Sequence, residues 1–138
     1  MKQPLALFFI GLSIVSAAVA DENRAETNYI LNCQGCHQSD ARGLPGSVPN
    51  MKNFVGQFVG VPGGREFLIQ VPGSSLSPLS DDALAELLNW ILLTKSQKEL
   101  PADFVLYTGE EVSIVRPKKL PDVAAARKAI VSKFVNQQ

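Results

Sequence analysis

The chain has 138 residues, with 13 lysines and arginines, 13 aspartates and glutamates, and one histidine. The formal net charge is therefore zero, and the interspersed charges argue against a nucleic-acid-binding domain, which carries a strongly basic face. The length favours one modest domain with a tail over two ordinary domains.

The first residues have the pattern of a secretory signal peptide. Lys2 precedes an apolar run from Leu5 to Val19, which ends in Ala18-Val19-Ala20. The run is short for a membrane span and ends in the small-x-small pattern that signal peptidases cleave. We therefore expect cleavage after Ala20 and a periplasmic location, with an uncleaved anchor as the alternative. No later apolar stretch approaches the length of a membrane span.

The next feature is a helix followed at once by two cysteines and a histidine. Residues 21–32 have helical spacing, and Cys33, Cys36 and His37 come directly after them. Two cysteines in an exported chain would first suggest a disulfide. Their Cys-x-x-Cys-His spacing is instead the attachment signature of haem c. We expect one covalent haem c on Cys33 and Cys36, with its iron bound by His37, the only histidine.

Three other interpretations of these residues stay open. A structural zinc site needs four nitrogen or sulfur ligands, and two cysteines and one histidine supply three. A redox dithiol of thioredoxin type would lie between a strand and a helix, and no such pattern precedes Cys33. The last interpretation is a structural disulfide beside a histidine that binds nothing.

The middle of the chain predicts a loop and then helices. Glycines and prolines break regular structure between residues 39 and 49, and short helices are expected at residues 53–59 and 64–71. Ser80 opens the clearest helix, expected to end near Lys95, because its hydroxyl can accept from first-turn amides. Five apolar side chains give this helix one face for burial: Leu84, Leu87, Leu88, Ile91 and Leu92.

Beyond residue 100 the chain has a tail that the core does not obviously require. Thr108 to Glu111 fits a capping box for a short helix, and Asp122 is expected to cap a last helix. No segment shows the two-residue alternation of a sheet, so the predicted fold class is all-α. We expect a signal peptide at residues 1–20, a domain at 21–100, and a C-terminal helical extension at 101–138 that packs on or docks from that domain.

From about Ala25 to Ile91 the sequence resembles the class I cytochrome c family. Besides the haem motif, Pro49 and Asn50 match the family's Pro-Asn pair, and Pro49 stands twelve residues after His37. The resemblance implies that the Pro49 carbonyl accepts a hydrogen bond from the iron-binding imidazole and fixes its tautomer. It also implies a cytochrome c-like fold, with helices around one covalently bound haem.

Two pairs of helical residues extend the resemblance. Ala25 and Tyr29 look like the small and aromatic positions of the family's first helix, and Leu87 and Trp90 look like their partners. In the family these two helices cross closely, because the small residue lets the backbones approach while the aromatic rings pack together.

The far side of the haem departs from the family pattern. Class I cytochromes usually place a methionine there, in a loop ahead of the leucine matched by Leu87, but Val71 to Pro78 contains none. Met51 stands where the family has the leucine of Pro-Asn-Leu. We therefore expect Met51 to contact the haem on the face that His37 occupies. A loop rebuilt to make it an iron ligand is the alternative.

The missing methionine affects the iron, because an iron without an axial thioether is harder to reduce or keeps an open position. An open or weakly occupied sixth position is the preferred expectation, since a lysine or tyrosinate ligand needs a strongly shifted pKa. Ligation by Lys52 or Tyr107, and completion of the site by a partner protein, are the alternatives.

The function predicted first is electron transfer to or from a periplasmic dehydrogenase or oxidase. Arg42, Lys52 and Arg65 are expected near the haem rim, where they would steer this partner. The chain shows no acid–base pair and no activated nucleophile, because its single histidine is committed to iron. We therefore do not expect an enzyme.

Two other functions remain as hypotheses. One is a haem protein whose open site binds nitric oxide or carbon monoxide, in an apolar distal pocket formed by Phe67, Leu68, Leu76 or Leu79. The other is a haem subunit of a larger oxidoreductase complex. That subunit would dock through an exposed apolar stripe of the tail, made of Phe104, Val105, Val112, Ile130 and Phe134.

Overall fold

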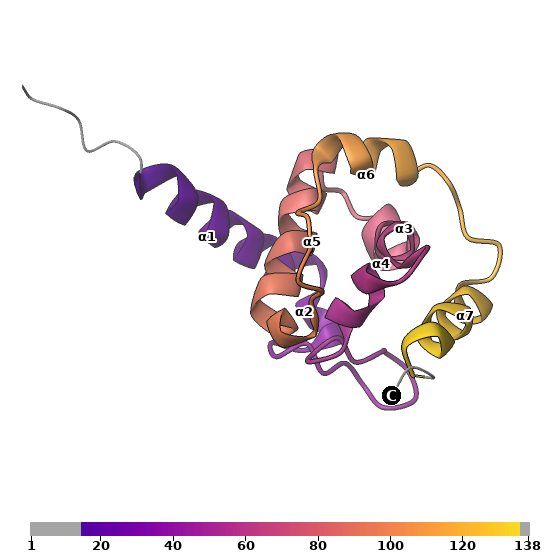
Figure 1. Ribbon diagram of the computed structural model, residues 1–138. Helices are drawn as coiled ribbons and strands as arrows, with labels where there is room; N and C mark the ends of the chain where they lie inside the picture. Colours follow the sequence, from indigo (N-terminus) through magenta and orange to yellow (C-terminus); the bar gives the residue numbers. More distant parts are fainter. Residues whose placement is uncertain (1–14, 136–138) are drawn as a thin grey trace, which may run out of the picture.

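The computed structural model describes residues 15–135, whose regular structure is helical (Figure 1). Residues 1–14, which hold most of the predicted signal peptide, and residues 136–138 lie outside the described residues. The elements in chain order are α1 (Val15–Asn32), α2 (Gln34–His37), η1 (Val55–Gly60), α3 (Gly64–Gln70), α4 (Pro72–Ser75), α5 (Asp81–Lys95), η2 (Gln97–Glu99), α6 (Gly109–Val115) and α7 (Val123–Val135).

Strands are absent from residues 15–135, where the β-type pairing consists of an isolated bridge between Leu44 and Val48. The predicted all-α class is therefore confirmed. No helix within the same residues combines the length and hydropathy needed to cross a membrane.

Helices α1 and α5 pack against each other, as the class I resemblance implied. Tyr29 of α1 and Trp90 of α5 place their ring centroids 5.2 Å apart, at an interplanar angle of 42°. Ala25, one helical turn before Tyr29, is 2% exposed, and so small a residue lets two helix backbones approach. The Lys95 ammonium lies 4.7 Å from the Trp90 ring centroid and adds a cation–π contact.

The start of α5 follows the sequence prediction. The Ser80 hydroxyl accepts a hydrogen bond from the Ala83 amide at 3.2 Å. Asp81 and Asp82 lie in the first turn and Lys95 in the last, where their charges complement the helix dipole. The predicted apolar face is buried: Leu84, Leu87, Leu88, Ile91 and Leu92.

Aromatic side chains and one glycine join η1 to α3. The Phe58 and Phe67 rings stack with centroids 5.6 Å apart. A Cβ atom on Gly64 would lie 1.8 Å from the Phe58 carbonyl oxygen, so this approach requires glycine. Phe134 of α7 completes the cluster, with its ring centroid 5.4 Å from that of Phe58.

The C-terminal extension wraps around this body. In Figure 1 it runs along α5, crosses the top of the view as α6 and descends to α7. Helix α6 packs against α5 and α3, and α7 packs against η1 and α3. Both predicted caps are present, because Thr108 Oγ1 accepts from the Glu111 amide at 3.2 Å and Asp122 Oδ1 from the Ala125 amide at 2.9 Å.

The apolar side chains of the extension do not form the exposed stripe predicted for a docking element. Val112 is fully buried, and Ile130 and Phe134 are each 7% exposed, because they complete the core. Phe104 is half-buried, whereas Val105 is 70% exposed. Docking of a haem subunit through this stripe is therefore wrong: most of the stripe is already covered by this chain.

Candidate haem-binding site

A single helical turn carries both cysteines and the histidine. α1 ends at Asn32, and the Cys33 amide still donates to the Tyr29 carbonyl at 2.9 Å. The next turn, α2, closes when the His37 amide donates to the Cys33 carbonyl, also at 2.9 Å. The two thiols and the imidazole therefore belong to one turn at the end of α1, whose helix packs against α5 (Figure 1).

The two thiols are not joined to each other. Cys33 is half-buried and Cys36 is exposed, and both are free. Burial, with a smaller contribution from Cys36, raises the pKa of the Cys33 thiol to about 11. A redox dithiol of thioredoxin type works with a lowered thiol pKa, so the environment of Cys33 argues against that interpretation. The free thiols likewise disagree with a structural disulfide.

The His37 imidazole is the unsatisfied polar group of this turn. Its Nδ1 atom is buried and has no hydrogen-bond partner among residues 15–135. Burial lowers the pKa of His37, and the nearby Pro49 carbonyl offsets part of that effect. A neutral imidazole is the form that binds metals, and a backbone carbonyl beside its second nitrogen is the usual orienting partner. These residues fit a haem that is attached by two thioethers and bound at iron by one imidazole.

The loop after His37 is folded tightly beneath this turn. The Tyr29 hydroxyl donates to the Gln38 carbonyl at 2.6 Å, and the Gly43 amide donates to the His37 carbonyl at 2.9 Å. Gly43 has φ of 68°, and a Cβ atom there would lie 2.4 Å from the Val48 carbonyl oxygen. Glycine is thus required where the loop doubles back toward Pro49.

Met51 follows this loop as a half-buried side chain that packs against the core. Its amide donates to the carbonyl of the buried Ala41 at 2.8 Å, and its own carbonyl accepts from the Val55 amide at 2.9 Å. The backbone of Met51 is therefore held on both sides. Its haem contact, like that of Pro49, stays a prediction.

The charged side chains predicted at the haem rim are paired within the chain. Arg42 and Lys52 both contact the Asp40 carboxylate. Arg65 forms a bidentate pair with Glu111, with nitrogen–oxygen distances of 2.9 and 2.7 Å, and its side chain is 25% exposed. Arg65 thus differs from the prediction, because it fastens the extension to α3 instead of standing free.

Tyr107 and Lys52, the two alternative iron ligands, are also engaged elsewhere. The buried Tyr107 hydroxyl donates to the Arg65 carbonyl at 3.1 Å, and its ring lies under the Arg65 guanidinium at 4.1 Å. Burial raises the pKa of Tyr107 above its usual range. The Lys52 ammonium lies 3.5 Å from Asp40. The Tyr107 hydroxyl is therefore engaged in the core, whereas the Lys52 side chain is 42% exposed and its ligation stays an alternative.

The four apolar residues proposed for the distal pocket differ in exposure, and the pocket stays a prediction. Phe67 and Leu68 are buried in the core, Leu79 is half-buried, and Leu76 is 76% exposed. The segment that holds Leu76 is instead bound by Arg116, a residue that the sequence analysis did not single out, because a lone arginine after a short helix carries no motif.

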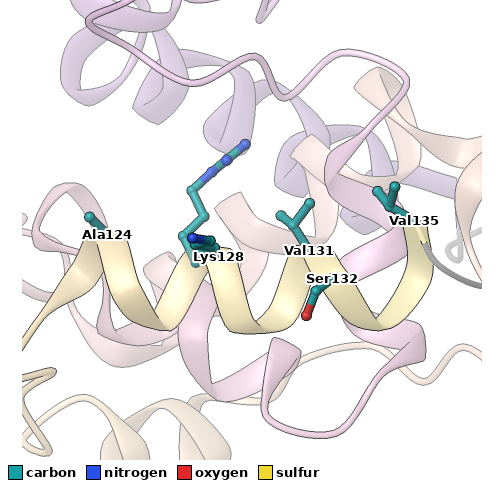
Figure 2. Close-up of a pocket in the computed structure, with 6 residues that line it drawn as sticks. Ala124, Lys128, Val131, Ser132 and Val135 are labelled. Atoms are coloured by element: carbon teal, nitrogen blue, oxygen red, sulfur yellow. The ribbon is translucent and has the colours of Figure 1, made fainter.

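Two hollows on the described surface involve the extension and not the haem turn. One, of about 460 Å³, runs along α7 (Figure 2) and is lined by Ala124, Arg127, Lys128, Val131, Ser132 and Val135. The other, of about 530 Å³, lies where α4 and the start of α5 meet the linker after α6. Neither is lined by Cys33, Cys36 or His37.

No family model matches the chain. The chain is 31% identical over 152 aligned positions to a cytochrome c-552 of Thermus thermophilus, in an alignment that covers 94% of this chain and 98% of the relative. It is 33% identical over 118 positions to a second cytochrome c-552 sequence of Thermus thermophilus, covering 71% of this chain and 90% of the relative. The chain therefore belongs to the cytochrome c-552 family, small class I c-type cytochromes that carry electrons on a covalently attached haem c.

Proposed function

We propose that this protein is a periplasmic electron carrier that holds one haem c through Cys33 and Cys36 and binds its iron through His37. The observation that carries the proposal is the turn at residues 33–37, where two free thiols and an imidazole whose pKa is lowered by burial share one helical turn. When bound, haem c supplies a one-electron couple between ferric and ferrous iron.

The surrounding residues have separate tasks in this proposal. The Pro49 carbonyl orients the imidazole through Nδ1 and leaves Nε2 for the metal, since a neutral imidazole has one donor and one acceptor nitrogen. Met51 packs beside it on the same side. Tyr29, whose hydroxyl holds the Gln38 carbonyl at 2.6 Å, fixes the loop that follows His37.

Export is the second part of the proposal. The small-x-small sequence at Ala18 to Ala20 supports cleavage there. N-terminal sequencing of the protein from a periplasmic fraction is expected to begin at Asp21. An intact leader on a membrane-bound protein would contradict this part and leave the haem site unaffected.

Electron transfer is tested by voltammetry of the purified haem protein. We expect a reversible one-electron wave, at a potential lower than that of a cytochrome with an axial methionine, because Val71 to Pro78 contains no thioether. A sulfur-to-iron absorption band in the ferric protein would contradict the open distal side and assign Met51 as ligand. Irreversible reduction would contradict the carrier function.

The partner that fits the surface best is an acidic redox protein. Basic residues gather after Arg116, where one acid, Asp122, accompanies five bases: Lys118, Lys119, Arg127, Lys128 and Lys133. The Asp122 carboxylate already accepts from the Ala125 amide, and Lys128 is exposed beside the α7 hollow (Figure 2). Uncompensated charge of this kind steers association.

This steering is tested by the rate of electron exchange with a carboxylate-coated electrode. The rate is expected to fall with ionic strength and to fall again in Lys128→Gln. The matched control is Lys98→Gln, an exposed lysine outside the extension. Equal effects of both substitutions would contradict steering by α7.

Ligand binding is the second candidate function, and one observation favours it. The residues between α3 and α5 are valine, proline, glycine, serine and leucine, none of which is a strong iron ligand. Lys52 and Tyr107 are held by Asp40 and Arg65. Carbon monoxide added to the reduced protein is expected to change its spectrum rapidly. An unchanged spectrum would exclude this function and leave the carrier function intact.

A further inference from the structure

Arg116 connects the end of α6 to the segment between α4 and α5. Its side chain is 16% exposed and makes five hydrogen bonds. Nε donates to the Ser75 carbonyl at 3.1 Å, and Nη1 donates to the Leu79 carbonyl at 2.8 Å and to Asp81 Oδ1 at 2.9 Å. Nη2 donates to the carbonyl and the hydroxyl of Ser77. The contacted residues, Ser75 to Asp81, are called the clamped turn below.

This arrangement uses the whole hydrogen-bonding capacity of the side chain. A guanidinium has five N–H donors in a fixed plane and accepts none. Here each donor has an acceptor, and four of the five acceptors are neutral oxygens of the clamped turn. A lysine ammonium offers three donors from one point, so it cannot reach carbonyls spread over Ser75, Ser77 and Leu79.

Apart from Arg116, the clamped turn is held by hydrogen bonds to nearby residues of the chain. The Ser75, Leu76 and Ser77 amides donate to the Val71, Pro72 and Ser74 carbonyls at 2.9, 3.1 and 3.2 Å. The Ser77 hydroxyl also donates to the Ser74 carbonyl at 2.9 Å, and the Ser80 hydroxyl caps α5. All of these bonds lie within residues 71–83. Leu76, its largest apolar side chain together with Leu79, is 76% exposed and contributes little burial. A neighbouring tether, from Gln70 Nε2 to the Lys118 carbonyl at 2.9 Å, joins α3 to the same linker.

The clamped turn follows α4 in the stretch where the class I resemblance leads one to expect the axial methionine, which is absent here. A bond from a loop side chain to the iron would tie such a loop to the haem. We propose that Arg116 is a positioning residue: located in the C-terminal extension, it holds the clamped turn in place of such a bond to the iron. The extension thereby sets the conformation of the distal side. The haem part of this inference rests on the proposed function, and the clamp itself does not.

The clamp is tested first by amide hydrogen exchange of the full chain. In Arg116→Gln, exchange across residues 72–80 is expected to accelerate about tenfold or more, because the half-buried carbonyls of Ser75, Ser77 and Leu79 lose charged donors, while residues 23–32 of α1 keep their rates. Arg116→Lys is expected to resemble Arg116→Gln. The matched control, Lys98→Gln, removes one positive charge from an exposed position outside the extension and is expected to match the wild type.

A milder variant, Asp81→Asn, also tests the clamp. Asp81→Asn keeps the Oδ1 acceptor but removes its charge, and it is expected to give an intermediate acceleration. The clamp therefore stays testable should Arg116→Gln fail to fold. Wild-type exchange in Asp81→Asn and in Arg116→Lys would overturn the clamp.

The positioning role is tested by properties of the haem, in addition to amide hydrogen exchange. In the haem-loaded protein, Arg116→Gln is expected to shift the ferric absorption spectrum and to change the association rate of carbon monoxide, whereas Lys98→Gln changes neither. Faster exchange with both haem readouts unchanged would reduce Arg116 to a structural clamp and overturn the positioning role. A protein without haem would refute the proposed function, and the exchange measurement would still decide on the clamp.

Discussion

The turn at residues 33–37 and the C-terminal extension are held in opposite ways. The turn is built from contacts within a few residues of chain, and it leaves both thiols free and one of them exposed. The extension is fixed by contacts between residues far apart in sequence, with every donor of Arg116 satisfied and Arg65 paired in a bidentate manner. A binding site can thus be encoded locally and left open for its ligand, whereas a clamp needs the completed fold.

The largest effect is expected in the turn at residues 33–37. His37→Ala removes the only imidazole of the chain, so the iron loses its protein ligand, and we expect the haem spectrum of the native protein to disappear. Absorption spectroscopy of the purified variant checks this. Ser39→Ala, at an exposed position of the same loop, is the control and is expected to keep the native spectrum.

Within the C-terminal extension, the largest loss of stability is expected from replacing Phe134. Phe134→Ala is expected to lower the free energy of unfolding by about 3–5 kcal/mol, because the ring is buried against Phe54 and Phe58. Urea denaturation measures the change. Val135→Ala, at the next position and 54% exposed, is expected to stay within about 0.5 kcal/mol of the wild type. Equal effects would mean that α7 does not contribute to the core.

A smaller effect is expected at the ion pair that joins α3 to α6. Arg65→Gln is expected to cost about 1–3 kcal/mol of unfolding free energy, since Glu111 and the Val105 carbonyl both lose a charged donor. Arg42→Gln serves as its control, because Arg42 is 72% exposed and exposed pairs contribute at most about 1 kcal/mol. An equal loss of unfolding free energy in Arg42→Gln would mean that the Arg65–Glu111 pair contributes no more than an exposed ion pair.

The smallest effect appears at alkaline pH. Burial, the largest cause, raises the pKa of Tyr107 above its usual value, so the folded chain keeps a proton that the unfolded chain loses above about pH 10. Stability therefore falls as the pH rises through that value. In Tyr107→Phe this part of the fall is expected to vanish in urea denaturation between neutral and alkaline pH. Tyr29, whose pKa burial raises to about 12, keeps a residual slope.

Local signals explain what the sequence predicted. Ser80, Thr108 and Asp122 each cap a helix, as expected, because a cap needs only the next few amides. The Cys-x-x-Cys-His turn and the packing of Tyr29 on Trp90 likewise follow from spacing and from family resemblance. These features made the all-α class and the haem-binding turn predictable.

The roles of Arg65 and Arg116 could not be predicted, because they depend on contacts with residues far away in the sequence. Arg65 was expected at the haem rim. It instead pairs with Glu111 and lies over the Tyr107 ring, both more than forty residues away in sequence. Glu111 itself was expected to reach back to its own helix start. Arg116 carries no signal, because its acceptors are backbone carbonyls whose positions exist only in the folded chain.

The most direct test of the haem-binding turn is the intact mass of the purified protein, produced together with a working c-type maturation system. The account predicts a coloured protein whose mass equals the chain from Asp21 plus one haem, and an unmodified mass for the Cys33→Ser, Cys36→Ser double variant. A colourless protein of unmodified mass, or a haem retained by the double variant through denaturation, would contradict attachment through these two sulfurs.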